Sequence, residues 1–530
     1  MLVVCHAPVN YARQQLVPTP LFSGYKNRSV APEGGLFDSD RTLFDVTWFG
    51  AVGDGKTYDT VAVRDATAAV SHNGGGTLLF PGGTSERTYL TGAFNLTSNV
   101  IMIVEAGATL LGSPRSEDWP LVEPLPWYGG GSDQQQQGTR EYQALVHADG
   151  ASNVTLTGGG VINGNGMHWW RCKENTEWDH ASPPCGNAQG VYHSRPHLIM
   201  IVRGSDVKVT NLTVIDSPNW TLHFAMVNGL LVANNSVHSP GTDAPNTDGI
   251  NLDCTQDALV EDNYVAVGDD ALCVKSGIDY LGRTFGKPSQ NITFRRNTIG
   301  TGHGITIGSE MSAGVSDVIF EDITMDCTNV GIRLKSQRGR GGVVQNVTYR
   351  NIHMKSIDEE CVQVTLNYHG NGHSTETQTN WTATPAFNDI AFENVLCEHG
   401  KASYFLDGLP ERAIKRLSLI NITMGLRAGT EKRCAHAVCT CDALTMPCPS
   451  CCTPDYQLLA TRDWMPSAGR RGPSAQYLEI RDRLMEKERR KKEEKGKLKA
   501  EKEQKEAEQK EREQTERGQT EREQMEREQT

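Results

Sequence analysis

The sequence predicts an all-β fold, a right-handed parallel β-helix in which short strands stack rung upon rung. A six-residue pattern recurs along the chain: a polar or glycine residue, two apolar residues one position apart, then a polar residue. Its copies begin at Asp206, Gly229, Asp257, Asn291, Asp317, Asn346 and Asp389. They lie 23, 28, 34, 26, 29 and 43 residues apart, and self-similarity at such a period indicates a solenoid.

Each copy has the composition of a β-strand, with period-2 alternation and β-branched or aromatic residues. Almost no helical periodicity separates the copies, so the strands recur in one direction with short links, which favours the parallel coil. Near the start, Val61, Ala62, Ala66 and Ala69 form an apolar face at helical spacing. We expect a short N-terminal helix there that covers the first rung.

Changes in composition divide the 530 residues. We expect an N-terminal extension over residues 1–40, the β-helix domain over 41–430, a cysteine-rich segment over 431–455, a linker over 456–480 and a charged low-complexity tail over 481–530. The tail consists largely of Glu, Lys, Arg and Gln. It has too few apolar residues for a coiled-coil seam, so it is either a single solvated helix or disordered.

Six cysteines fall within 19 residues near the end of the β-helix domain. They are Cys434, Cys439, Cys441, Cys448, Cys451 and Cys452. A disulfide cluster and a zinc site both fit these residue types, and the irregular spacing favours disulfides. The pairing cannot be deduced from the sequence. Cys172 and Cys185 bracket a 12-residue insertion and could form a further bridge.

The charge and the sorting features of the chain limit its partners and its location. A formal net charge of −12 makes nucleic acid an unexpected partner, and no stretch is long and apolar enough to span a membrane. Ten Asn-X-Ser/Thr sequences favour a secreted glycoprotein, although several of these asparagines lie on the repeat and have a structural explanation. Residues 1–40 contain no secretory signal that we recognise, because the apolar start is too short.

Four polar motifs run through the repeats at about the same period. They are Asn246-Thr247-Asp248-Gly249, Gly268-Asp269-Asp270, Gly302-His303-Gly304 and Arg333-Leu334-Lys335. Equivalent strands stack about 4.8 Å apart, so residues one rung apart in sequence become neighbours in space. We therefore expect the carboxylates, the histidine and the two cations to form one column on one face. Asn246 shares the face of Asp248, and Gly268 permits a bend that turns both Asp269 and Asp270 toward the column.

Such a column has the groups that glycoside hydrolysis needs. One carboxyl group protonates the leaving oxygen while another activates water, and close carboxylates raise one pKa so that the acid keeps its proton. Arg333 and Lys335 supply positive charge for an anionic sugar. Turns of a solenoid are rich in Asp, Asn and Gly for structural reasons alone. The occurrence of all four motifs in order at rung spacing favours a catalytic site.

The stretch from Phe44 to Asn421 resembles the polygalacturonase family of glycoside hydrolases, family 28. The four motifs look like that family's signatures, with Leu334 where isoleucine is commoner. The resemblance implies that Asp269 is the general acid, that Asp248 and Asp270 activate water, and that His303 supports the acid. It further implies that Asn246, Arg333, Lys335 and Tyr368 bind substrate.

The activity that the resemblance implies is inverting hydrolysis of α-1,4-galacturonan in pectin, without metal or cofactor, by a secreted and, we expect, monomeric enzyme. Residues 303–314 resemble the exo-acting branch, and the segments Trp119–Tyr128 and Cys172–Cys185 are candidates for blocking one end of a cleft. Exo action is therefore preferred over endo action. The aromatic residues of the first segment either stack on sugars or pack locally. The alternatives are hydrolysis of xylogalacturonan or rhamnogalacturonan, and a non-catalytic pectin-binding β-helix.

Overall fold

The computed structural model describes residues 41–83, 86–128, 140–174, 194–368, 383–426 and 431–454. The predicted N-terminal extension, linker and charged tail lie outside the described residues. The chain divides into two compact units, Met1–Ala468 and Gly469–Thr530, and the second is wholly outside the described part. The predicted domain boundaries therefore remain a prediction.

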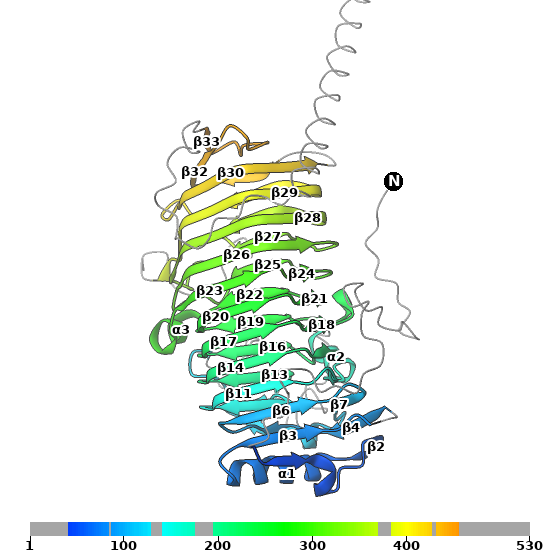
Figure 1. Cartoon of the computed structure of the whole chain (residues 1–530). Coiled ribbons are helices and arrows are strands. Elements are labelled where there is room, and N and C mark those ends of the chain that lie inside the picture. Colours follow the sequence, from blue (N-terminus) through cyan, green and yellow to red (C-terminus); the bar gives the residue numbers. More distant parts are fainter. Residues whose placement is uncertain are drawn as a thin grey trace, which may run out of the picture. The chain divides into compact units, whose positions relative to one another are not determined.

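The described residues form a right-handed parallel β-helix whose strands lie in three stacks (Figure 1). Within each stack a strand pairs in parallel with its equivalents one rung before and one rung after. The first stack contains β1 (Leu43–Asp45), β3 (Gly76–Phe80), β6 (Val100–Val104), β11 (Ser152–Thr157), β14 (Ser205–Thr210), β17 (Asn228–Ala233), β20 (Gln256–Glu261), β23 (Ser289–Arg295), β26 (Val315–Met325), β28 (Val343–Thr365), β29 (Ala386–Asp407), β30 (Ile414–Leu426), β32 (Ala437–Cys441) and β33 (Thr453–Pro454).

The other two stacks complete each turn of the coil. The second contains β2 (Asp54–Tyr58), β4 (Arg87–Thr91), β7 (Ala108–Gly112), β12 (Val161–Asn163), β15 (Thr213–Ile215), β18 (Ser236–His238), β21 (Tyr264–Ala266) and β24 (Thr298–Ile299). The third contains β5 (Phe94–Asn95), β10 (Val146–Asp149), β13 (Ile199–Val202), β16 (Leu222–Ala225), β19 (Ile250–Asp253), β22 (Leu272–Lys275), β25 (Ile305–Gly308), β27 (Ile332–Lys335) and β31 (Glu431–Ala435). The long strands β28 and β29 also continue the third stack, since they pair with β27 and β31.

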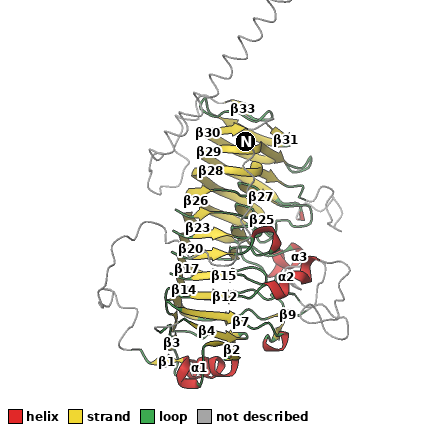
Figure 2. Cartoon of the chain, turned by 90° about the vertical axis from the view of Figure 1, so that its right-hand side faces the viewer, coloured by secondary structure: helices red, strands yellow, loops and turns green. Residues whose placement is uncertain are grey.

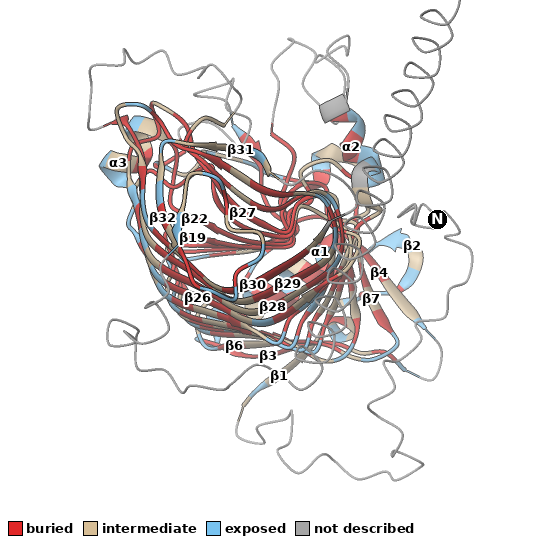
Figure 3. Cartoon of the chain, turned by 90° about the horizontal axis from the view of Figure 1, so that it is seen from above, coloured by how far each residue is buried: buried red, intermediate tan, exposed pale blue. Residues whose placement is uncertain are grey.

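The repeat found in the sequence is the inward-facing part of the first stack. Its second apolar position forms a buried ladder of Phe294, Phe320, Tyr349 and Phe392, with ring centroids 4.6, 4.8 and 5.3 Å apart. The polar residue that opens each copy is left-handed at most rungs, as in Asp257 with φ 56°, a conformation that Asp and Asn tolerate. Viewed along the stack, buried residues run along the inner sides of the coil (Figure 3).

Helix α1 (Thr60–His72) covers the first rungs, as the sequence predicts (Figure 1). It packs on β1, β3, β4 and β5. The expected apolar face was wrong in part: Val61 is 70% exposed, whereas Val63 and Val70 are buried beside Ala62 and Ala66. The observed face buries two valines and two alanines, which removes more apolar surface from water than the expected face of one valine and three alanines.

The last rungs are held by the cysteine cluster. Its six cysteines form the disulfides Cys434–Cys451, Cys439–Cys452 and Cys441–Cys448. The preference for disulfides is confirmed, and the zinc alternative fails because no thiolate of the cluster is left to bind a metal. The sequence analysis missed a fourth bridge, Cys361–Cys397. Cys172 is also disulfide-bonded, but its expected partner Cys185 lies outside the described residues.

A few elements lie outside the three stacks. Strands β8 (Leu121–Val122) and β9 (Glu141–Tyr142) form an antiparallel pair. The remaining helices are α2 (Met167–Glu174), α3 (Asp279–Phe285) and the 3₁₀ turns η1 (Val46–Phe49), η2 (Ser116–Asp118) and η3 (Gly241–Asp243). Figure 2 shows α2 and α3 on the side of the coil that also carries β25 and β27. Among the described residues, no helix has the length and hydropathy to cross a membrane.

Candidate active site

The site lies on the third stack, where consecutive strands are in register. Asp248, Asp270 and His303 each occur two residues before a strand, and those strands pair Ile250 with Leu272 and Leu272 with Ile305. The three side chains therefore occupy equivalent places on successive rungs, as the spacing predicts. Arg333 and Lys335 lie inside the next strand, β27, and both point outward because Ile332 and Leu334 are fully buried.

The turn before β22 brings Asp269 and Asp270 to the same place. The backbone N–H of Gly268 donates to Thr247 Oγ1 at 3.0 Å. A Cβ atom at Gly268 would lie 2.2 Å from two carbonyl oxygens of the preceding turn. The glycine is thus required for close approach of two turns, which differs from the expected bend. The Asp270 N–H then donates to Asp269 Oδ1 at 2.9 Å, which fixes the orientation of that carboxylate.

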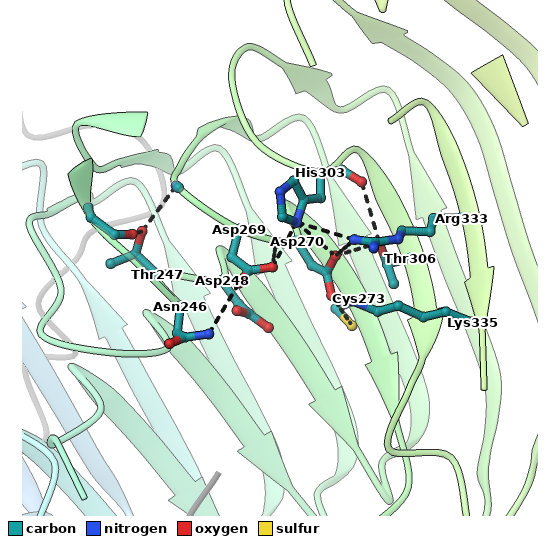
Figure 4. A network of polar contacts seen from close by, with 12 residues as sticks. Asn246, Thr247, Asp248, Asp269, Asp270, Cys273, His303, Thr306, Arg333 and Lys335 are labelled. Atoms are coloured by element: carbon teal, nitrogen blue, oxygen red, sulfur yellow. Dashed lines mark hydrogen bonds and ion pairs between the residues drawn. The ribbon is translucent and has the colours of Figure 1, made fainter. Parts of the chain in front are cut away.

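The carboxylates are joined to the histidine and the cations by a continuous polar network (Figure 4). His303 Nδ1 lies 3.0 Å from Asp269 Oδ1 and 3.2 Å from Arg333 Nη1. Lys335 Nζ donates to Asp270 Oδ2 at 2.9 Å, and Thr306 Oγ1 donates to Asp270 Oδ1 at 2.9 Å. A protonated Nδ1 donates to Asp269, whereas an unprotonated one accepts from Arg333, so the proton on this nitrogen decides which neighbour it binds.

The three carboxyl groups differ in exposure. The side chain of Asp269 is 21% exposed and that of His303 is 31% exposed. Asp248 and Asp270 are 3% and 1% exposed. A bound molecule therefore reaches Asp269 and His303 first, while Asp248 and Asp270 form the floor of the site.

Burial and charge also separate the pKa values. Burial raises the pKa of Asp248 well above its usual range, although the ammonium of Lys275 opposes this. Burial acts on Asp269 in the same direction, but the hydrogen bond from His303 and the nearby lysines outweigh it and lower the pKa of that carboxyl. Burial likewise opposes the effect of Lys335 on Asp270, whose pKa is lowered. The surroundings thus move the pKa values of neighbouring carboxyl groups in opposite directions, upward for Asp248 and downward for Asp269 and Asp270.

Two further charged residues were missed by the sequence analysis. Lys275 Nζ lies 3.3 Å from Asp248 Oδ2 and 3.1 Å from Glu310 Oε2, and all three side chains are largely buried. Lys275 and Glu310 lower the cost of burying each other's charge, and the pKa of Glu310 falls to about 2, since Lys275 outweighs the effect of burial. Register could have found Lys275, because it precedes Lys335 by two rungs at the same place on the strand.

All eight predicted site residues come together, Asn246 and Tyr368 included. Arg333 Nη2 lies 3.4 Å from the Tyr368 hydroxyl, and Lys335 Nζ lies 5.3 Å from the centroid of its ring. Asn246 bridges two side chains: its Oδ1 accepts from Arg195 at 2.7 Å and its Nδ2 lies 3.3 Å from Asp269 Oδ2. Its contacts are those of a residue that positions Asp269, and its role in substrate binding stays a prediction.

The same cluster contains two groupings with metal-ligand atoms, Asp248 with Asp270 and Cys273, and Asp269 with Asp270 and His303. Ammonium groups already lie against these carboxylates, at 3.3 Å from Asp248 and 2.9 Å from Asp270. A metal ion would have to displace or repel these charges. The donor set therefore suits an anionic ligand near the cations better than a bound metal.

Aromatic side chains pack on the outer face of the third stack on the N-terminal side of the carboxylates. We call Trp127, Tyr128 and Trp220 the aromatic wall. Each is at most 6% exposed, and they pack in one cluster with residues of β13 and β16. Trp127 Nε1 donates to Asp253 Oδ2 at 3.1 Å, and the ring centroid of Trp220 lies 4.4 Å from Lys275 Nζ. The aromatic residues of the segment Trp119–Tyr128 were expected either to stack on sugars or to pack locally, and in the structure they pack locally.

The parallel β-helix and its outward-facing carboxylates, histidine and cations define a polysaccharide-hydrolysing class of β-helix enzyme. A family model described as glycosyl hydrolases family 28 matches residues 128–441. A probable polygalacturonase of Vitis vinifera is 33% identical over 390 residues, which is 72% of this chain and 74% of that protein. The chain therefore belongs to glycoside hydrolase family 28 and is a glycoside hydrolase.

Two further relatives represent both modes of attack. An endo-polygalacturonase of Pectobacterium carotovorum subsp. carotovorum is 28% identical, covering 64% of this chain and 78% of that protein. The crystal structure of a hyperthermoactive exopolygalacturonase from Thermotoga maritima superimposes with a TM-score of 0.61 at 25% identity, covering 75% of this chain and 87% of that one. The likeness to these proteins supports the family and leaves the mode of attack open.

Proposed function

We propose that this enzyme is a polygalacturonase, which hydrolyses the α-1,4-galacturonosyl linkages of pectin. The observation that carries the proposal is the position of Arg333, Lys335 and Tyr368 beside the carboxylates. Two cations and a tyrosine at the scissile position suit a sugar that carries a carboxylate. Membership of a hydrolase family sets aside the non-catalytic alternative, and no observation favours xylogalacturonan or rhamnogalacturonan.

The proposed mechanism assigns one role to each carboxyl group of the site. Asp269, the most exposed of the three carboxyl groups, protonates the leaving oxygen, and Asp248 with Asp270 activates water for a single displacement. Asp269 is ionised in the ligand-free site because of His303 and the nearby lysines. A galacturonate carboxylate bound at Arg333 and Lys335 neutralises this positive field, which raises the pKa of Asp269. The negative charge of the substrate thus favours the protonated form of Asp269.

We further propose that the enzyme attacks chain ends. The aromatic wall lies against Lys275, and Lys275 contacts Asp248. In this proposal, the wall leaves a polymer bound at the carboxylates room for only a short segment on the N-terminal side. Cleavage near that end releases a short product from the chain terminus, which favours exo action.

The test is a product profile on polygalacturonic acid in the presence of a chelator. Reducing ends and the absorbance of unsaturated sugars are followed from the first minutes, and the anomer released first is identified by NMR. We expect saturated monomer from the outset with inverted configuration. Mixed oligomers would contradict exo action, retained configuration would contradict single displacement, and unsaturated products would contradict hydrolysis.

We also propose that the protein is secreted and monomeric. Four disulfides among the described residues support an oxidising compartment. Glycan mapping after expression in a secretory eukaryotic host tests this. Asn211 and Asn234 are exposed, whereas Asn219 is only 2% exposed. We expect glycan on Asn211 or Asn234, and glycan on Asn219 in folded protein would contradict the structure. Size-exclusion chromatography tests the oligomeric state.

A further inference from the structure

Beyond the predicted site residues, the same line of outward-facing side chains continues toward the C-terminal rungs. Register pairs Thr306 with Arg333, Arg333 with Gln363, Gln363 with Phe405 and Phe405 with Arg433. We call Gln363, Phe405 and Arg433 the distal strip. Phe405 stands between Tyr404 and Leu406, which are 0% and 1% exposed, so its own partly exposed ring points outward.

The distal strip is physically continuous with the proposed substrate-binding cations. Arg333 Nε donates to Gln363 Oε1 at 2.8 Å. At the far end, Arg433 Nε donates to Asp407 Oδ1 at 2.6 Å. The carboxylate of Asp407 is 4% exposed while the side chain of Arg433 is 50% exposed. The buried acid holds the guanidinium in place and leaves its outer N–H groups facing solvent.

The chemistry of this strip fits an extended acidic polysaccharide. A partly exposed aromatic ring can pack against the apolar face of a sugar. The ammonium of Lys432 lies 5.6 Å from the centroid of the Phe405 ring, which adds positive charge beside it. Arg433 offers the planar donors that recognise a carboxylate. Both cations are ion-paired, Lys432 with Glu360 and Arg433 with Asp407. The strip would therefore bind a carboxylate through the N–H groups that face solvent rather than through an excess of positive charge.

The proposed role of the aromatic wall sets the direction in which a bound polymer extends along the strip. A polymer bound at the carboxylates is stopped on the N-terminal side and extends toward β28, β29 and β31. Three rungs separate Arg333 from Arg433, about 14 Å at the usual strand spacing. A dimer held at the catalytic carboxylates is too short to reach Arg433, whereas a longer chain passes over Phe405 first and then Arg433.

We propose that the distal strip is a second carboxylate-binding region that makes the enzyme favour long galacturonan chains. This inference rests on the proposed polygalacturonase activity and adds to it the residues that bind the uncleaved part of the chain. Phe405 packs on a sugar and Arg433 binds a uronate carboxylate several residues from the cleaved bond.

The experiment compares kcat/KM on galacturonate dimer, tetramer and hexamer for the wild type, Phe405→Ala and Arg433→Gln. The matched control is Arg416→Gln, since Arg416 is also an exposed arginine paired with an aspartate, Asp389, but on the first stack. We expect Phe405→Ala to lower kcat/KM on hexamer about three- to tenfold, mainly through KM. We expect Arg433→Gln to lower kcat/KM on hexamer about two- to fivefold, and added salt to reduce this loss relative to the wild type. The losses become smaller as the oligomer becomes shorter and are smallest on the dimer.

Each outcome decides between the two proposals. If the wild type hydrolyses galacturonates but both variants match Arg416→Gln at every length, or lose activity equally at every length, the distal strip is not a binding region. If the wild type leaves all three oligomers intact, the proposed function fails and the strip fails with it. Circular dichroism of Arg433→Gln, an exposed substitution, shows whether its loss comes from binding or from misfolding.

Discussion

At the scale of single residues, the site depends on a buried cation, Lys275, which contacts protein carboxylates rather than substrate. Lys275 is 4% exposed and lies between Asp248 and Glu310. Its ammonium opposes the burial that raises the pKa of Asp248. Without it, Asp248 and Glu310 would lose the one cation that contacts them both in this buried space, which is costly. We regard Lys275 as a positioning residue that keeps Asp248 able to ionise.

Replacing Lys275 by methionine keeps its approximate volume and removes the charge. Asp248 would then ionise only at higher pH, because the attraction that lowered its pKa is gone. If Asp248 activates water in its ionised form, we expect the acidic limb of the kcat/KM profile to move to higher pH, with a fall of about tenfold or more at the original optimum. Glu310→Gln is the control, since it removes the other partner of Lys275. An unchanged acidic limb in Lys275→Met would contradict this role.

The contrast between the predicted and the missed residues has a physical reason. Asp248, Asp269, Asp270 and His303 lie in turns beside glycines, where a polar cluster interrupts the strand pattern and is visible in sequence. No motif around Lys275 or Glu310 distinguishes them from other charged residues in the sequence. Only the register of the folded coil places one against the other. The ionised state of Asp269 was likewise invisible, because it depends on His303 and lysines from other rungs.

At the scale of elements, the proposed attack on chain ends depends on the aromatic wall. The segment before Gly129 leaves the coil after β7 and returns to cover the outer face of β13 and β16. Trp127 joins it to the sheet through Asp253, whose other oxygen accepts from the Gly277 N–H at 3.1 Å. The wall is thus anchored on the rung that also carries Asp248.

Trp127→Ala should open the aromatic wall. We expect the products from polygalacturonate to shift from monomer toward mixed oligomers, because the polymer can now extend past the carboxylates on the N-terminal side. The matched control is Trp119→Ala, which also removes a buried indole whose Nε1 donates a hydrogen bond, here to Ser113 O at 3.0 Å. Each change costs about 3–5 kcal/mol of stability. A Trp127 variant that still releases only monomer would show that the wall does not set the mode of attack.

Element prediction succeeded where the pattern is local and failed where it is not. The strands of the first stack follow from alternation within six residues. The Cys361–Cys397 bridge joins β28 to β29 across 36 residues, and no spacing rule identifies it. The rotation of α1 depends on which of several apolar residues meets the first rung, so the helix was predictable and its buried face was not.

At the scale of the whole β-helix domain, stability depends on closing both ends of an otherwise open stack. Helix α1 covers the first rungs, and three disulfides at the last ones tie β31 and β32 to residues 448–452, which precede β33. An exposed terminal rung would offer unpaired backbone groups to another chain. The sequence indicated both features, but it did not show that the cysteine-rich segment continues the parallel stack through β32.

Removing the bridge Cys441–Cys448 by a double alanine substitution tests the contribution of this closed end. We expect the free energy of unfolding to fall by about 2 kcal/mol, since the bridge closes a short loop. Denaturant midpoints under non-reducing conditions measure it. Cys254→Ala, at a buried cysteine without a disulfide, is the control for loss of a buried sulfur. Equal midpoints for the double variant and the wild type would mean that the last rungs do not limit stability.

The most direct test of the central claim compares the wild type with Asp269→Asn on polygalacturonic acid, scoring hydrolysis by reducing ends and binding by affinity electrophoresis. The substitution keeps the shape of the side chain and removes its proton-donating ability. We predict that hydrolysis falls by about 10²- to 10⁴-fold while binding changes little, because Arg333, Lys335 and Tyr368 remain in place. Hydrolysis by Asp269→Asn at a rate near that of the wild type would contradict the assignment of this site as the catalytic centre.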